Sequence, residues 1–296
     1  MFDSVAMENA ATPLWERLGL FPAAAVATSA GVVYSRRACS PDYHGAVTHV
    51  LLHGIGSGSG SWLAQLEQAH NAAQRPCHVV AWDAPGYGGS AALAPDAPRA
   101  ADYAQRFWAW LDALQFDITQ PFTLVGHSLG ALMAAAAAVQ CPTRVQRMVL
   151  LSPAQGYARA SAAVRDKKLS DRLAALAQFG PSGMAHRRAR AMLSPHADAQ
   201  QIAFVEQVMA GIEPHGYAQA ARMLANADIL ADLAQLQCPV TVASGAADTV
   251  TPMDACRALA LQIGAPYLSL GEVGHSCALE AGVAVNGLLG IGGVAP

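Results

Sequence analysis

One pentapeptide, Gly-His-Ser-Leu-Gly at residues 126–130, constrains this chain more than any other stretch. An apolar run at residues 122–125 has strand character, and an alanine-rich segment at residues 131–139 follows the pentapeptide directly. This order predicts a strand, a sharp turn and a helix. Glycines at both ends of the turn let the helix begin close against the strand, with Ser128 in a strained backbone conformation. We expect its hydroxyl to lie at the carboxyl edge of a sheet, beside a helix N-terminus that favours negative charge.

The composition is that of one large globular domain. Of the 296 residues, 53% are hydrophobic and 13% are charged. Such a chain can bury a large core, and one α/β domain with an insertion fits it better than two independent domains. The formal net charge is -3 and no long basic run is present. Nucleic acid and anionic membranes are therefore disfavoured as main partners, and we expect a small-molecule substrate.

The six cysteines are scattered along the chain without close pairs or a metal-ligand spacing with histidine. This pattern argues against a structural zinc and favours reduced thiols. The N-terminal residues lack the basic start and apolar core of a secretory signal. No apolar run approaches the roughly 20 residues of a membrane span. We therefore expect a cytoplasmic protein without a metal site.

Strand-like and helical segments alternate through the first half of the chain. The expected strands are a hairpin at residues 24–26 and 32–34 and buried runs at 47–52, 79–82 and 145–151. The expected helices are a short turn at 14–18, then 103–114 and 131–140. Alternation of this kind implies parallel strands joined by right-handed crossovers, so the loops that follow the strands gather at one edge of the sheet.

The pattern changes between residues 154 and 237, where strand-like runs vanish. Helical stretches take their place at 158–179, 184–193, 199–210 and 216–234, and we interpret the segment as an inserted helical lid. Strand character resumes at 239–243 and 267–270, and an apolar helix is expected at 278–289. The predicted division is a first part of the core (1–153), the lid (154–237) and a second part of the core (238–296).

A glycine-rich loop at residues 53–62 follows the first buried strand. Its glycine spacing fits neither nucleotide-binding fingerprint. Small residues instead favour an oxyanion hole, in which backbone N–H groups point at a reacting carbonyl oxygen. We expect the two donors to be the N–H groups of Ile55 and Leu129. Substrate contacts are expected at Gly54, Gly56 and Trp62 of the same loop.

A serine hydroxyl is a poor nucleophile at neutral pH and needs a neighbouring base. Imidazole suits this role, and a carboxylate fixes its tautomer and stabilises its cation. The residues placed to do so are His275 and Asp248, each just beyond a late strand. The competing carboxylates are Asp254, which would cap the next helix, Asp228 and Asp232.

The other polar residues near these motifs are given structural roles. His127 and His53 are expected to pack within the fold, and Asp83, which precedes a Pro-Gly turn, to fix its loop. The remaining histidines are placed on surface or lid segments: His44, His70, His78, His186, His196 and His215.

Three features together resemble the α/β-hydrolase superfamily over nearly all of residues 23–290. They are the glycine-rich loop, the pentapeptide around Ser128, and the positions of Asp248 and His275 beyond two late strands. In that family the nucleophile, the acid and the histidine follow one another in this order. The resemblance implies an α/β fold, with a mostly parallel central sheet flanked by helices and an inserted helical lid. It also implies a Ser128–His275–Asp248 triad.

The expected reaction is acyl transfer to water by a serine hydrolase that uses no metal or organic cofactor. Its expected substrate is a small-molecule carboxylic ester or lactone, cleaved through an acyl-enzyme intermediate. Carboxylesterases, enol-lactonases and hydrolases of ring-opened aromatic products are the members that the chain resembles. In the last group, which cleaves C–C or C–N bonds of carboxylate-bearing compounds, tryptophan typically follows the histidine, whereas here Ser276 does. Glu280, five residues beyond His275, recurs in several of these families. An acyltransferase or a ligand receptor that retains the triad are further alternatives.

The expected lid carries seven arginines that suit a substrate carboxylate, although a solvated helix face explains each one as well. They are Arg159, Arg165, Arg172, Arg187, Arg188, Arg190 and Arg222. Its methionines and phenylalanines are expected mainly to pack within the lid, with any that face the sheet lining an apolar pocket. They are Met184, Met192, Met209, Met223, Phe179 and Phe204. The sequence does not indicate an oligomeric state.

Overall fold

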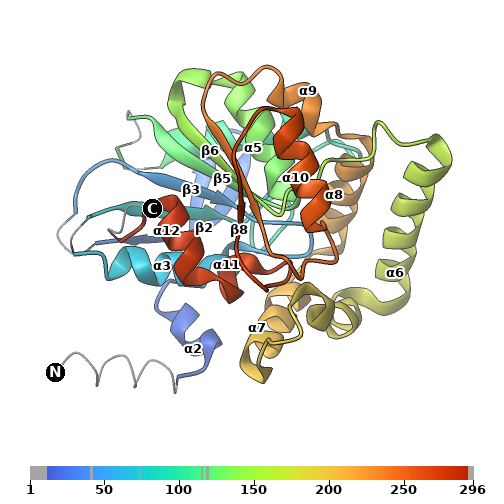
Figure 1. The fold of residues 1–296 in the computed structure, drawn as a ribbon, viewed down its shortest axis with the longest axis horizontal. Helices are drawn as coiled ribbons and strands as arrows, with labels where there is room; N and C mark the ends of the chain where they lie inside the picture. The colour runs from blue at the N-terminus through green and yellow to red at the C-terminus, as the bar shows by residue number, and fades with distance from the viewer. Residues whose placement is uncertain (1–11, 41–42, 74, 115, 118–119, 293–296) are drawn as a thin grey trace.

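The fold is built on an eight-stranded sheet with the order β1-β2-β4-β3-β5-β6-β7-β8 (Figure 1). It comes from a computed structural model that describes residues 12–40, 43–73, 75–114, 116–117 and 120–292. Strand β1 pairs antiparallel with β2, and β2 pairs antiparallel with β4. All other neighbouring strands are parallel. The mostly parallel sheet predicted from the sequence is therefore confirmed.

The strands lie within a few residues of the predicted positions. They are β1 (Ala24–Thr28), β2 (Gly31–Cys39), β3 (His49–Leu52), β4 (His78–Trp82), β5 (Phe122–His127), β6 (Val145–Leu151), β7 (Val240–Ser244) and β8 (Tyr267–Ser269). The predicted hairpin is the pair β1 and β2 at one edge of the sheet. Every residue of β3, β4 and β5 is buried, which explains why these strands are continuous apolar runs in the sequence.

The two faces of the sheet carry separate apolar cores because successive strand residues point to opposite faces. Val80 and Trp82 of β4 belong to one core, which also contains residues of α4, α5, α9 and α10. Val79 and Ala81 belong to the other, with residues of α2, α3, α11 and α12. The helices named are α2 (Leu14–Gly19), α3 (Leu63–His70), α4 (Ala100–Ala113), α5 (Leu129–Gln140), α9 (Ile229–Leu233), α10 (Met253–Gln262), α11 (Cys277–Glu280) and α12 (Gly282–Leu289). No helix in the described part of the chain is long and apolar enough to cross a membrane.

Residues 154–237, between β6 and β7, contain none of the eight strands, and we call them the helical insertion. Its elements are α6 (Ala162–Arg188), the 3-10 helix η3 (Ala189–Met192), α7 (Ala199–Ala210), α8 (Pro214–Asn226) and α9. Helix α6 stands apart from the sheet at one side of the molecule (Figure 1). It changes direction at Gly180, whose φ is 61°, directly before Pro181.

The predicted continuous helix at 216–234 is wrong, because the chain breaks between α8 and α9. Ala227 is extended, with ψ 154°, and ends α8. The Asp228 side chain then accepts a hydrogen bond from the N–H of Leu230, at 3.1 Å, and caps α9. A cap of this kind favours a new helix start over a continuous helix.

The chain enters and leaves the helical insertion through two adjacent segments, 155–158 and 224–229, which we call the neck. Three backbone hydrogen bonds of 3.1 Å join them: Tyr157 N to Leu224 O, Ala158 N to Ala227 O and Ile229 N to Gln155 O. A Cβ atom on Gly156, which has φ +81°, would lie 2.0 Å from the carbonyl oxygen of Ala227. The close pairing of the neck therefore requires glycine at this position.

Candidate active site

Ser128 stands at a sharp turn between β5 and α5, as the sequence predicts. Its φ of 52° is uncommon for a residue other than glycine. A Cβ atom on Gly126 would lie 2.6 Å from Ala131 Cα, and one on Gly130 would lie 2.2 Å from Leu52 O. Neither approach is open to a residue with a side chain. The two glycines therefore allow α5 to begin against the strands while Ser128 occupies the turn between them.

The glycine-rich loop after β3 lies against Ser128. A Cβ atom on Gly54 would be 2.9 Å from Ser128 Cβ and 3.4 Å from its Oγ. The N–H groups of Ile55 and Leu129 donate no hydrogen bond to any residue that the structure describes. Leu129 begins α5, and N–H groups in a first helical turn have no acceptor within their helix. The two expected oxyanion donors thus lie on the two segments that meet at Ser128, and neither N–H has an acceptor among the described residues.

His53 fixes the orientation of the peptide between Gly54 and Ile55. Its Nε2 accepts a hydrogen bond from the N–H of Ala84 at 3.0 Å, so the neutral ring carries its proton on Nδ1. That nitrogen lies 2.8 Å from the Gly54 carbonyl oxygen and donates to it. Burial lowers the pKa of His53, which keeps the ring neutral. Because the C=O and N–H of a trans peptide point in opposite directions, this bond holds the direction of the Ile55 N–H.

Asp248 and His275 form a buried pair, with 2.9 Å between Asp248 Oδ2 and His275 Nδ1. The other carboxylate oxygen accepts hydrogen bonds from the N–H groups of Val250 and Thr251, at 2.8 Å and 3.0 Å. Burial by itself raises the pKa of Asp248, but the hydrogen bond and charge of His275 and the bonds from Thr251 hold it well below its ordinary value. The carboxylate is therefore ionised and orients the imidazole.

The competing carboxylates lie elsewhere. Asp228 caps α9 and forms an ion pair with Arg159 at 2.8 Å. Asp232 lies within α9. The expected capping role of Asp254 is wrong, because α10 begins after Pro252 and Asp254 falls inside its first turn. Among these four described carboxylates, Asp248 is the one bonded to His275.

Thr251, which no sequence motif indicates, is a further member of this group. Its Oγ1 lies 2.9 Å from Asp248 Oδ2, 3.0 Å from the carbonyl oxygen of Ser152 and 3.2 Å from His275 Nδ1. The hydroxyl thereby joins the Asp248–His275 pair to the end of β6. Its place three residues after the aspartate gives no local signal of this contact.

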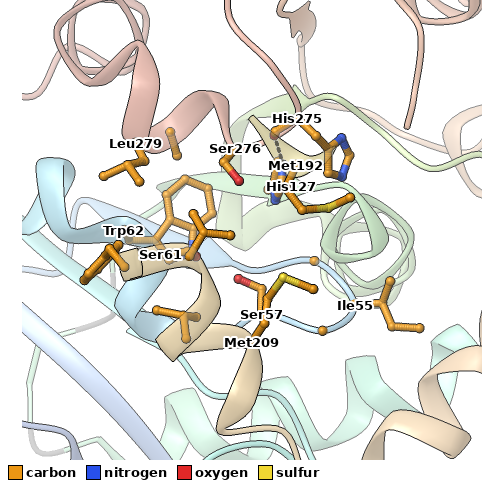
Figure 2. Close-up of a pocket in the computed structure, with 16 residues that line it drawn as sticks. Ile55, Ser57, Ser61, Trp62, His127, Met192, Met209, His275, Ser276 and Leu279 are labelled. Carbon is orange, nitrogen blue, oxygen red and sulfur yellow. Dashed lines mark hydrogen bonds between the residues drawn. The ribbon is translucent and has the colours of Figure 1, made fainter. Parts of the chain in front are cut away.

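His127, next to Ser128, lies 2.8 Å through its Nε2 from the backbone carbonyl oxygen of His275 (Figure 2). Burial, with the nearby charge of His275, lowers the pKa of His127 to about 3. The ring is therefore neutral, and its Nε2–H donates to the carbonyl. This agrees with the structural role expected for His127 and shows that it holds the backbone that carries the predicted base.

Two other histidines are buried away from this group. The surface position expected for His78 is wrong: it is the first residue of β4, is 6% exposed and packs edge-on against Phe116. Burial lowers the pKa of His78 to about 4. His49 is buried in β3, and burial likewise lowers its pKa to about 4.

Glu280 connects the loop around His275 to the helical insertion. Its carboxylate accepts hydrogen bonds from the N–H of Ser194 at 2.9 Å and from the N–H of Gly274 at 2.8 Å. On the other side of His275, the N–H of Ser276 donates to the carbonyl oxygen of Met192 at 2.8 Å. Residues 192–194 of the insertion are thus bonded directly to Ser276 and, through the Glu280 carboxylate, to Gly274, the two neighbours of His275.

A cavity of about 360 Å³, which we call the main cavity, lies between the core and the helical insertion. Ser128, Thr251 and His275 line it from the core, and Arg172, Arg188, Met184 and Tyr217 are among the residues that line it from the insertion. Ser128 is 5% exposed and His275 6%. The structure brings both side chains to this cavity, but within the described residues no hydrogen bond joins Ser128 Oγ to His275.

A second, smaller pocket of about 50 Å³ shares part of its lining with the main cavity, including Ile55, Gly56 and His275. Figure 2 shows Trp62, Leu279 and Met192 around it. Of the expected substrate contacts, Gly54 and Trp62 line this pocket and Gly56 lines both. Met192 and Met209 also line both spaces, and Phe204 lines the smaller pocket, whereas Met223 and Phe179 pack into the core.

Two of the seven arginines of the expected lid, Arg172 and Arg188, line the main cavity. The other five have other partners: Arg159 pairs with Asp228, Arg165 with Asp166, Arg187 stacks on Phe179, Arg190 donates to Ser194 O and Pro195 O, and Arg222 donates to Asp96 O. No group of three or more histidine, cysteine, aspartate or glutamate side chains in the described ranges is placed to hold a metal ion.

Comparison with known proteins gives a consistent result. The model of the family described as "Alpha/beta hydrolase family" matches residues 50–288. The (E)-2-((N-methylformamido)methylene)succinate hydrolase of Acinetobacter baylyi is 35% identical over 104 residues, which is 35% of this chain and 36% of that protein. A proposed carbamate hydrolase, RutD, of Klebsiella pneumoniae is 29% identical over 79% of this chain and 86% of its own length. The solved structure of an esterase from Thermogutta terrifontis superposes with a TM-score of 0.76, at 20% identity, over 90% of this chain and 96% of that one.

Proposed function

This chain belongs to the alpha/beta hydrolase family, and on that premise we propose that it is a serine hydrolase of a small-molecule carboxylic ester or lactone. The reaction would proceed through an acyl-enzyme intermediate. One observation carries the proposal: the 2.9 Å bond between Asp248 and His275 lies beside the cavity that Ser128 lines. An oriented imidazole next to a strained serine at a helix N-terminus is the arrangement that acyl transfer needs.

In this proposal His275 accepts the proton of Ser128 Oγ while that oxygen attacks the substrate carbonyl carbon. The N–H groups of Ile55 and Leu129 stabilise the tetrahedral oxyanion, and Asp248 stabilises the imidazolium. His275 then protonates the leaving alcohol, which gives the acyl-enzyme. Water activated by His275 releases the acid and restores Ser128. Each oxyanion donor is expected to lower the barrier by about 2.7 to 4 kcal/mol.

The helical insertion, residues 154–237, is proposed to act as a lid and to select the substrate. It supplies Arg172, Arg188 and Tyr217 to the main cavity, while the chemistry is assigned to residues of the core. Residues 1–153 and 238–296 would then form the catalytic core that surrounds the sheet.

Cleavage of a C–N bond is the second candidate. Two of the relatives, a methylformamido-methylene-succinate hydrolase and a proposed carbamate hydrolase, favour it. The same serine, histidine and oxyanion donors serve attack on an amide or carbamate carbonyl. A third outcome, transfer of the acyl group to an alcohol, is tested by product analysis with and without a competing alcohol.

The test compares wild type with Ser128→Ala on short p-nitrophenyl esters, lactones, N-formyl compounds and carbamates. We expect Ser128→Ala to lower kcat by at least about 10³-fold with an unchanged circular dichroism spectrum. Ser170→Ala, on an exposed face of α6, is the matched control and should keep full activity. Mass spectrometry of the wild type with a slow ester should show an acyl group on Ser128. Undiminished activity of Ser128→Ala would remove this residue from the mechanism.

A further inference from the structure

The charged side chains among the described residues that line the main cavity are two arginines. Arg172 and Arg188 line it, and none of its described lining residues is an aspartate, a glutamate or a lysine. Asp248 lies behind His275, is 4% exposed and does not line the cavity. The whole chain has a net charge of -3, so this is a local excess of positive charge beside Ser128.

Arg188 is half-buried, and its guanidinium has no hydrogen-bond or ion-pair partner in the described part of the chain. The five arginines of the insertion outside the cavity all have contacts with carboxylates, carbonyl oxygens or an aromatic ring. A guanidinium offers five N–H donors, and partial burial without acceptors is unfavourable. An anionic ligand in the cavity would supply those acceptors.

The guanidinium of Arg172 has one hydrogen-bond acceptor and one aromatic contact among the described residues. Its Nη1 donates to the carbonyl oxygen of Lys168 at 3.0 Å, and its guanidinium lies 5.7 Å from the centre of the Tyr157 ring. In a straight helix, Arg172 and Arg188 would be separated by about 24 Å, since they are 16 positions apart (188 − 172) and each residue rises about 1.5 Å. The change of direction at Gly180 lies between them and accounts for their meeting at one cavity.

Tyr217 provides a further donor on the same wall. Arg172, Arg188 and Tyr217 line the same cavity. Burial raises the pKa of Tyr217, and the positive charges of Arg188 and Arg172 act in the opposite direction. The net effect keeps the hydroxyl protonated. A tyrosine O–H and two arginine side chains thus face a space large enough for a small organic molecule.

We propose that Arg172 and Arg188 bind an anionic oxygen group of the substrate, a carboxylate or a phosphate, at the end remote from the bond that is cleaved. Arginine recognises both groups by paired hydrogen bonds. The smaller pocket, lined largely by apolar side chains such as Trp62, Phe204 and Leu279, takes the uncharged end. The inference rests on the proposed function and narrows its substrates to esters or amides of compounds that carry an acid group.

The kinetic test compares mono-p-nitrophenyl glutarate with p-nitrophenyl pentanoate, which has the same acyl chain length but no charge. We expect the wild type to prefer the anionic ester, after subtraction of the uncatalysed rate. Arg188→Gln and Arg172→Gln should each lower kcat/KM for that ester by about 10- to 100-fold, mainly through KM, and change the neutral ester less than about threefold. Arg187→Gln is the matched control, because Arg187 is the adjacent residue, carries the same charge and lies outside the cavity on Phe179.

A binding test separates this inference from the proposed reaction. Ser128→Ala, which is expected to be inactive, is titrated calorimetrically with glutarate, with propyl phosphate and with neutral pentanamide, alone and combined with Arg188→Gln. Binding of an anion that is lost with Arg188→Gln supports the site even if no ester is cleaved, and the tighter anion identifies the group. Ester cleavage without charge preference, and no anion binding, would overturn the arginine site and leave the hydrolase proposal intact. Equal losses on both esters, or an effect of Arg187→Gln as large as that of Arg188→Gln, would also overturn it.

Discussion

His127 donates a hydrogen bond from its Nε2 to the backbone carbonyl oxygen of His275, with 2.8 Å between the two atoms (Figure 2). The residue beside the proposed nucleophile therefore holds the loop that carries the proposed base. Burial lowers the pKa of His127 to about 3, so the ring stays neutral near pH 7 and keeps this hydrogen bond. One sharp turn thus positions Ser128 directly and His275 through its neighbour.

The first prediction concerns this bond. His127→Phe keeps a ring of similar size but removes the donor, so the loop at His275 should lose its fixed position. We expect kcat to fall by about 10- to 100-fold with KM changed less than about threefold, since small displacements of catalytic groups have effects of that size. His127→Gln, which keeps an N–H donor, should retain more activity. Equal and full activity of both variants in steady-state assays would contradict the positioning role.

The second prediction concerns the contact of Gly54 with Ser128. A methyl group at residue 54 would lie 2.9 Å from Ser128 Cβ, so Gly54→Ala should displace the peptide that carries the Ile55 N–H. We expect kcat to fall by about 10²- to 10³-fold, as for the loss of one oxyanion donor. The control is Gly287→Ala in α12, where a new Cβ meets no atom within 4 Å. It should keep full activity and gain up to about 1 kcal/mol in unfolding free energy. An active Gly54→Ala variant would argue against the oxyanion loop.

The third prediction concerns Glu280, which accepts hydrogen bonds from the N–H groups of Ser194 and Gly274. Glu280→Ala should free both, so hydrogen-deuterium exchange should become faster in peptides that cover 189–196 and 272–278. We also expect about a tenfold lower kcat/KM, because the His275 loop loses its support. Glu272→Ala, at an exposed position, serves as the control. Unchanged exchange in residues 189–196 would show that Glu280 does not hold the insertion.

The fourth prediction concerns acid stability. Burial lowers the pKa of His49 and of His78 to about 4, whereas an unfolded chain has its histidines near the ordinary value of 6.5. As the pH falls below 6.5, the unfolded state binds protons first, and the folded state loses stability until the pH reaches about 4. Between these two pH values, each histidine should lower the unfolding free energy by about 1.4 kcal/mol for every unit that the pH falls. Urea unfolding between pH 8 and pH 4.5 measures it, and His49→Gln should reduce the slope. A flat profile would contradict the burial effect.

Local sequence signals were sufficient for the sheet and for the turn at Ser128, since glycine spacing and apolar runs act over a few residues. They do not reveal the cap at Asp228, which breaks a predicted helix. Contacts between distant segments are also hidden. Arg187 and Arg188 are neighbours in sequence, yet one stacks on Phe179 and the other lines the main cavity. Their directions depend on the turn of α6 at Gly180, which sequence periodicity does not specify.

The neck has a consequence for how such a chain diversifies. Because its two segments are bonded to each other, residues 159–223 leave from and return to nearly the same point. Insertions, deletions or an exchanged helix between those ends need not disturb the strands beneath. New substrate specificities can therefore arise by changes within residues 159–223 alone, provided that the replacement still supplies hydrogen-bond partners for Glu280 and Ser276.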